Sequence, residues 1–198
     1  MDITGILAWL EASSLATRIR DSLLLFPLLE SIHVIGLALV FGTIAIIDLR
    51  LLGTASAERP FKLMAEDILK WTWAAFALTA LTGALMFITN AAVYYDNSYF
   101  RVKMLLLALS GINMLAFELT AGRTVGRWDR APSAPAAGKA VAVLSIALWI
   151  GIIVMGRMIG FTATRATSQP LPADVNFEDF LGADTPDGGT PAAQPESK

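Results

Sequence analysis

Four long apolar segments constrain the fold of this 198-residue chain more than any other feature of its sequence. A hydrocarbon core about 30 Å thick takes about 20 consecutive apolar residues to cross as a helix. In lipid each segment must also satisfy its own backbone hydrogen bonds, and none of the four alternates as a barrel strand would. We therefore predict four transmembrane helices, near residues 23–49, 71–93, 102–121 and 140–161.

The composition agrees with this prediction and limits the chemistry. Of the residues, 55% are hydrophobic and only 16% are charged, and the chain has no cysteine and a single histidine. These counts exclude disulfides, thiolate metal sites and cysteine nucleophiles. We find no H-E-x-x-H motif, no glycine-rich phosphate loop and no Ser/His/Asp set, so we assign no catalytic residue and no metal site. The scattered basic residues also exclude a nucleic-acid surface.

The chain divides into three parts. Residues 1–20 carry a polar stripe on an otherwise apolar helical pattern, which predicts an amphipathic helix in the membrane interface. Residues 21–165 hold the four spans. Residues 166–198 contain one Lys against six acidic residues and are rich in Pro and Gly, which predicts a disordered tail. The expected fold class is an all-α membrane protein, a four-helix bundle with an interfacial helix at its N-terminus.

The distribution of basic residues predicts the orientation. Together with Arg50, the loops 53–70 and 122–139 hold eight Lys and Arg, whereas the loop 92–101 holds mainly Tyr, Asp and Asn. By the positive-inside rule the two basic loops face the cytoplasm. We expect a bacterial inner-membrane protein with both termini in the periplasm.

Ionisable residues inside the spans are the candidate functional residues, because charged groups in a membrane are expensive and usually functional. Glu30 and His33 share one face of the first span, and the predicted topology brings Lys103 and Arg157 to the same outward depth. Asn113 continues the polar stripe of Lys103 along the third span. The predicted binding residues are therefore Glu30, His33, Lys103, Asn113 and Arg157.

A purely structural role is the alternative for these residues. Glu30 would then pair with Lys103 or Arg157, and His33 would hydrogen-bond Ser110 or a backbone carbonyl. Lys103 and Arg157 also lie close enough to the membrane interface to snorkel, which would remove them from the site.

Three runs of sequence carry a resemblance to known proteins: ESIHVIGLALVFGTIAIIDLRLLG, YFRVKMLLLALSGINMLAFE and ALWIGIIVMGRMIGF. They resemble an uncharacterised bacterial family of four-helix membrane proteins. More distantly, they are similar to CopD-like copper-resistance membrane domains and to the haem-containing four-helix protoporphyrinogen oxidase. The resemblance to the oxidase implies His33 as an axial ligand of haem b and Lys103 as a residue near the porphyrin. No second His exists, so haem would need His33 alone, His33 with a Met, or His33 from two chains.

These observations leave three functional hypotheses open, and the sequence does not decide whether the protein is an enzyme. The first is an outward-facing site that binds a small ligand, with haem b as the candidate. The second is an accessory or scaffold subunit of a membrane complex, with a homodimer or another membrane protein as partner besides the lipid bilayer. Its contacts would come from the acidic tail or from the small residues Gly156 and Gly160. The third is a small proton-coupled or metal transporter that uses Glu30 and His33 as a relay.

Overall fold

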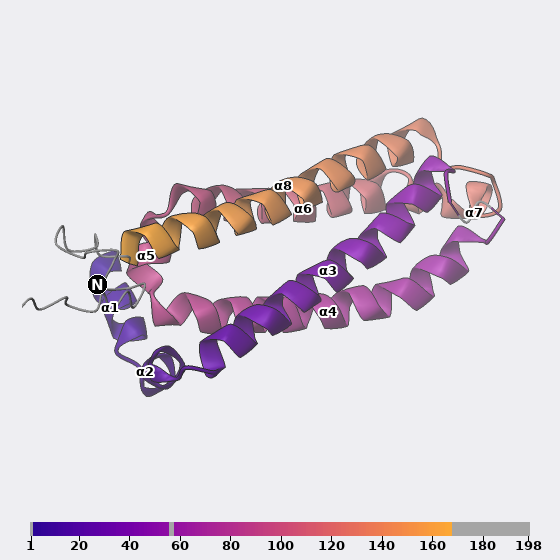
Figure 1. The fold of residues 1–198 in the computed structure, drawn as a ribbon. Coiled ribbons are helices and arrows are strands. Elements are labelled where there is room, and N and C mark those ends of the chain that lie inside the picture. The colour runs from indigo at the N-terminus through magenta and orange to yellow at the C-terminus, as the bar shows by residue number, and fades with distance from the viewer. Residues whose placement is uncertain (1, 56–57, 168–198) are drawn as a thin grey trace, which may run out of the picture. The chain divides into compact units, whose positions relative to one another are not determined.

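The computed structural model describes residues 2–55 and 58–167, and for residues 163–167 it describes the backbone alone. One compact unit spans Met1–Arg165 (Figure 1). Its described residues form helices and turns without a strand, which confirms the all-α prediction. The helices are α1 (Ile3–Glu11), α2 (Ser14–Asp21), α3 (Leu25–Leu52), α4 (Phe61–Thr89), α5 (Ala91–Asp96), α6 (Ser98–Leu119), the 3-10 turn η1 (Gly122–Thr124), α7 (Val125–Trp128) and α8 (Ala136–Thr167).

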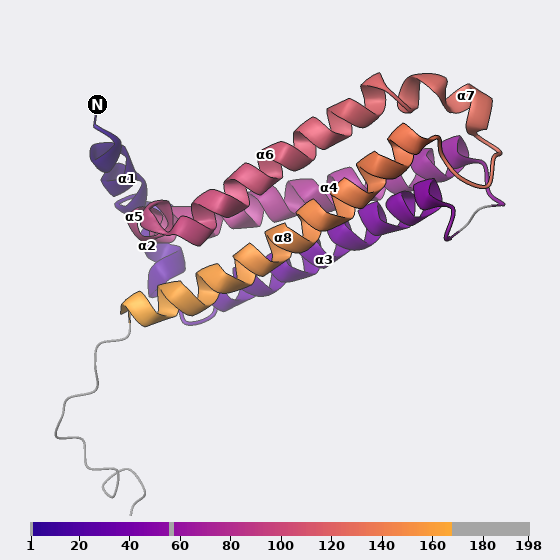
Figure 2. The ribbon, with the colours of Figure 1, turned by 90° about the horizontal axis from the view of Figure 1, so that it is seen from above.

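Four helical segments of the described chain are long and apolar enough to cross a membrane: Leu25–Leu52, Phe61–Thr89, Ser98–Trp128 and Ala136–Thr162. They run in alternating directions, so the unit has two ends (Figures 1 and 2). We call them the α5 end, where α1 and α2 also lie, and the α7 end. The four predicted spans are confirmed as helices, with bounds that differ from the expected ones.

The side chains of the bundle are distributed as lipid immersion requires. Large apolar residues point outward, among them Leu39, with 53% of its surface exposed. Between the helices lies a small core in which Val40, Ala75, Trp149 and Ile152 come from α3, α4 and α8. Because lipid is as apolar as the core, outward Leu and Ile carry no penalty in a membrane.

A buried arginine organises the α7 end. Arg50, in the last turn of α3, has no exposed surface, and its Nε and Nη2 donate to the carbonyl of Arg59 at 3.1 and 3.0 Å. Nη2 also donates to the carbonyls of Asp129 and Ala131 at 3.2 and 3.0 Å, and Nη1 to that of Pro132 at 3.5 Å. The five donors of a guanidinium suit such a set of carbonyls. Arg50 thereby joins the two loops of this end.

The start of α4 is fixed by the second of these loops. The carbonyl of Asp129 accepts from the backbone N–H of Phe61 at 3.0 Å, and its Oδ1 accepts from the N–H of Lys62 at 2.7 Å. A carboxylate at a helix N-terminus satisfies free N–H groups and favours the helix dipole. The N–H of Ala134 then donates to the carbonyl of Leu51 at 2.9 Å, which ties the loop to α3.

Aromatic packing completes the α7 end. The ring of Phe61 lies 5.0 Å from that of Trp128 and 5.9 Å from that of Phe117. The indole N–H of Trp128 donates to the carbonyl of Ala121 at 3.2 Å, so this buried polar group has a partner. The two basic loops predicted to share one side of the bundle therefore pack against each other.

Helix α3 ends in a tight turn at Gly53, whose φ of 79° is left-handed. There the N–H groups of Gly53 and Thr54 donate to the carbonyls of Arg50 and Leu49, both at 3.1 Å. A Cβ on Gly53 would lie 2.8 Å from the carbonyl oxygen of Pro132. Glycine is therefore required here both for the backbone angle and for the close approach of the loop.

The α5 end is held by capping interactions. Asn97 Oδ1 accepts from the N–H groups of Tyr99 and Phe100 at 2.9 and 3.3 Å and so caps α6. Its Nδ2 donates to Thr162 Oγ1 at 2.8 Å, which joins the start of α6 to α8. Arg20 of α2 donates to the carbonyl of Thr89 at 3.0 Å, at the end of α4.

Three boundaries differ from the sequence predictions. The single helix expected within residues 1–20 is divided into α1 and α2, because Ser13 leaves the helical conformation and accepts from the N–H of Ala16 as an N-cap. The second span begins at Phe61 instead of residue 71, since Pro60 and Asp129 initiate the helix ten residues earlier. The tail predicted over 166–198 lies outside the described residues from 168 onward.

Replacing Arg50 tests its role at the α7 end. We expect Arg50→Ala to lower the free energy of unfolding by about 3 kcal/mol, because several buried carbonyls lose their donor. Arg50→Lys should restore only part of this, since an ammonium has three donors and no planar fork. Thermal unfolding of the detergent-purified protein, followed by circular dichroism, measures both effects.

Arg59→Ala is the matched control, because Arg59 offers Arg50 only its backbone carbonyl and is itself exposed. It should unfold close to the wild-type temperature. Equal losses in Arg50→Ala and Arg59→Ala would contradict the proposed role of Arg50.

Candidate functional site at the α5 end of the bundle

The imidazole of His33 is held by α4 through one of its two nitrogens. His33 Nδ1 lies 3.0 Å from the carbonyl oxygen of Thr79 and 3.1 Å from Thr82 Oγ1. Because a carbonyl only accepts, Nδ1 carries the proton in this contact. The lone pair of a neutral imidazole is then on Nε2, which has no hydrogen bond within the described residues. This is the orientation that metal-ligating histidines commonly adopt.

Two glycines bring α3 close enough to α4 for this contact. A Cβ on Gly36 would collide with Thr79 Oγ1, and a Cβ on Gly83 would lie 3.0 Å from Cε1 of His33. Gly36 is buried and Gly83 is half-buried. The small residues thus fix both the helix separation and the position of the imidazole ring.

Lys103 of α6 supplies a positive charge beside His33. Its charge acts electrostatically on the imidazole, and its Nζ lies 3.6 Å from the position that a Cβ on Gly156 would take. The side chain is half-buried. No ion pair to Lys103 exists among the described residues, in which ion pairs join Lys70 to Asp67 and Arg101 to Asp96.

Glu30 and Arg157 lie on a shallow, open pocket of about 200 Å³ between α3 and α8, which Gly160 and Phe161 complete. The guanidinium of Arg157 lies 5.3 Å from the ring centroid of Phe161, a cation–π distance. Both charged side chains are exposed. Glu30 was expected in the bundle interior, whereas the exposure of Arg157 agrees with the alternative that this side chain snorkels to the interface. The structure therefore brings Glu30 and Arg157 together at the edge of the α5 end.

Tyr94 of α5 also belongs to this region. Burial raises the pKa of the Tyr94 phenol, and the negative charge of Glu30 raises it further. The Tyr94 ring packs at centroid distances of 6.3 Å from Phe87 and 6.0 Å from Phe100. A packed aromatic group with one hydroxyl thus lies within electrostatic reach of the Glu30 carboxylate.

Asn113, the fifth predicted residue, lies elsewhere. It is ten residues beyond Lys103 on α6, which corresponds to about 15 Å along the helix. Its Nδ2 donates to the carbonyl of Val141 at 3.0 Å, toward the α7 end. Ser110, one of the two partners expected for His33, instead donates to the carbonyl of Leu107. The other expected partner, a backbone carbonyl, is observed at Thr79. The structure thus gathers four of the five predicted residues, and their binding roles stay predictions.

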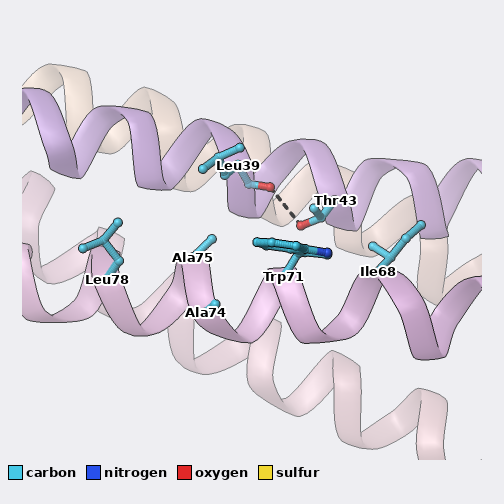
Figure 3. A pocket seen from close by; sticks show the side chains of 7 residues that line it. All are labelled: Leu39, Thr43, Ile68, Trp71, Ala74, Ala75 and Leu78. Atoms are coloured by element: carbon cyan, nitrogen blue, oxygen red, sulfur yellow. Dashed lines mark hydrogen bonds between the residues drawn. The ribbon is translucent and has the colours of Figure 1, made fainter.

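A separate groove of about 380 Å³ opens between α3 and α4 (Figure 3). Its lining is almost wholly apolar, and the hydroxyl of Thr43 donates to the carbonyl of Leu39 at 2.8 Å. No ionisable side chain lines it; the lining residues are Leu39, Thr43, Ile68, Trp71, Ala74, Ala75 and Leu78. This groove lacks the polar chemistry of the α5 end.

Sequence reasoning missed the residues of α4 that position His33. Thr79, Thr82 and Gly83 lie in the uncharged part of α4 beyond Lys70, where threonines look like ordinary polar residues of an apolar helix. The spacing of Thr79 and Thr82, three residues apart, was the available signal.

The fold and the site define an all-helical protein with four helices apolar enough to cross a membrane and a histidine held between two of them. Comparison with known families then identifies the family. The chain belongs to a family of unknown function, DUF6644, whose profile matches residues 7–162. No curated protein and no solved structure matches the chain, so the distant similarity to CopD-like domains and to the oxidase gains no support. The expected membership of an uncharacterised family is confirmed.

The contact between Gly36 and Thr79 gives a first prediction. Gly36→Leu should force α3 and α4 apart and lower the free energy of unfolding by about 1–3 kcal/mol. Gly42→Leu on the same helix is the control, because a Cβ there meets nothing within 4 Å. Thermal unfolding in detergent measures both, and equal destabilisation would contradict the close contact.

The charge of Glu30 gives a second prediction. Removing the carboxylate in Glu30→Gln abolishes its repulsion of the tyrosinate form, so the pKa of Tyr94 should fall while part of the elevation due to burial remains. Alkaline titration of tyrosinate absorbance measures this, with Tyr94→Phe identifying the contribution of Tyr94. An unchanged Tyr94 titration in Glu30→Gln would show that the two groups are not close.

Proposed function

We propose that this chain is a membrane protein that binds haem b at the α5 end, where His33 would hold the iron. The observation that carries the proposal is the state of the imidazole, in which Nδ1 is held by Thr79 and Thr82 while Nε2 is free to ligate. A ring fixed in this way is ready to coordinate without reorganising.

The scarcity of other ligands favours haem over a bare metal ion. No group of three or more His, Cys, Asp or Glu that could hold a metal ion occurs among the described residues. A porphyrin provides four of the ligands to its iron, so one histidine from the protein is sufficient. When bound, haem would supply redox or ligand-binding chemistry at iron.

The charges at the α5 end suit the two propionates of haem. Lys103 acts on His33 without a carboxylate partner in the described chain, and Arg157 lies exposed beside the pocket. Anionic groups are attracted to nearby cations, and the attraction to the half-buried Lys103 is screened less by water than that to the exposed Arg157. Glu30 opposes this attraction and would direct the propionates toward the two basic residues.

We further propose the bacterial inner membrane as the location, with the α5 end and both termini on the periplasmic side. The support is the concentration of basic residues in the loops of the α7 end. Arg50 contributes less to this excess of positive charge in the loops than the sequence suggested, because its guanidinium is buried against backbone carbonyls. A site at the α5 end would then be open to the periplasm.

Visible spectroscopy tests haem binding. The protein, purified in detergent from cells supplied with a haem precursor or titrated with hemin, should show a Soret band at one haem per chain. We expect His33→Gly to lose most of the band and added imidazole to restore it, because free imidazole can occupy the space of the missing ring.

Two controls make the test specific. Thr43→Ala, remote from His33, should keep the wild-type spectrum, and Lys103→Met should weaken hemin affinity without removing the axial ligand. Absence of a Soret band in the wild type, both as purified and after hemin addition, would overturn the proposal.

A further inference from the structure

A second buried polar layer lies toward the α7 end, and the proposed haem site does not use it. Asp48 of α3 has 4% of its surface exposed and Asn113 of α6 has 6%. Each has one side-chain oxygen, Oδ2 of Asp48 and Oδ1 of Asn113, that is buried without a hydrogen-bond partner in the described part of the chain. Such groups are costly in an apolar interior, and two in one layer need a common explanation.

Both residues meet the same turn of α8. The side chain of Ser145 hydrogen-bonds the Asp48 carboxyl, and the carbonyl of Val141 accepts from Asn113 Nδ2 at 3.0 Å. Val141 and Ser145 are four residues apart, so they lie one above the other on one face of the helix, about 6 Å apart along its axis. Asp48 of α3 and Asn113 of α6 therefore both contact one face of α8, at Ser145 and at the carbonyl of Val141.

No cation of the described chain balances Asp48. Arg50, two residues along α3, directs its guanidinium to backbone carbonyls of the loops. Lys139 on α8 is half-buried but forms no ion pair with Asp48 in the described residues. Asp129 is half-buried, and its Oδ1 accepts from the N–H of Lys62 at the start of α4. The remaining charged residues described at this end are exposed: Glu58, Arg59, Lys62, Glu66, Asp67, Lys70, Glu118, Arg123, Arg127 and Arg130.

We propose that Asp48, Asn113 and Ser145 form an intramembrane site for one monovalent cation, a proton carried on Asp48 or a sodium ion held by the three side-chain oxygens. One carboxylate balances one positive charge, and neutral amide and hydroxyl oxygens suit a hard cation. A proton on Oδ2 turns that atom into a donor, and a sodium ion takes both orphaned oxygens as ligands. In either form, the cation accounts for the unpartnered atoms.

Infrared difference spectroscopy of the full-length protein in lipid tests the site and separates the two cations. In potassium buffer, raising the pH from mildly acidic to alkaline should remove a protonated-carboxyl band of one equivalent per chain. At fixed pH, replacing potassium with sodium should shift the carboxyl or carboxylate bands only if sodium binds. We expect an Asp48-dependent signal in at least one arm.

Variants assign the signal. Asp48→Asn keeps a polar side chain of the same size and should abolish it, whereas Asp67→Asn, an exposed carboxyl on α4, should not. If Asp48→Asn fails to fold, Ser145→Ala should instead shift the frequency of the band, because the carboxyl loses a hydrogen bond. Wild-type spectra with no such signal in either arm, or a signal unaffected by these variants of the polar layer, would overturn the proposal. The Soret band tests the His33 site independently.

Discussion

The α7 end of the bundle depends on the guanidinium of Arg50. Its hydrogen bonds reach the carbonyls of both loops at this end, and Asp129, on one of those loops, starts α4. A buried charge is tolerated only when its hydrogen-bond donors have acceptors. The guanidinium of Arg50 therefore fixes the positions of these loop carbonyls. The same loop leads into α8, and its position therefore bears on the register in which Ser145 meets Asp48.

The bundle carries two polar layers separated by an apolar one. His33 and Asp48 are fifteen residues apart on α3, about 22 Å along the helix, and Val40 packs between them with Trp149 and Ile152. The layers differ in chemistry: the α5 end offers an imidazole and cations at an open edge, and the other offers buried oxygens. Asn113 lies in the same layer as Asp48, whereas Lys103 lies in the layer of His33. The polar stripe of α6 that contains Lys103 and Asn113 therefore contributes to two separate layers.

Prediction from sequence succeeded where the physics is local. Hydropathy identified four spans, because a segment that crosses lipid must be apolar over its whole length and must satisfy its own backbone as a helix. It failed on the orientation of side chains. Glu30 was expected to face inward and is exposed. His33 was expected to hydrogen-bond Ser110 or a backbone carbonyl, and the structure shows the second, the carbonyl of Thr79 on α4, a residue that the sequence did not single out. The sequence predicted His33 and Lys103 as residues of the site, but it did not predict the residues of α4 that position His33.

The sequence by itself determined the number of membrane-spanning helices, their alternating direction and the family of the chain, because these follow from apolar length and from residue identity along one segment. Only the tertiary structure decided which polar atoms meet. In a soluble helix the apolar stripe shows the buried face, but here lipid and core are equally apolar, so the sequence does not mark which face turns inward. The rotation and register of the packed helices placed His33 against Thr79 and Asp48 against Ser145.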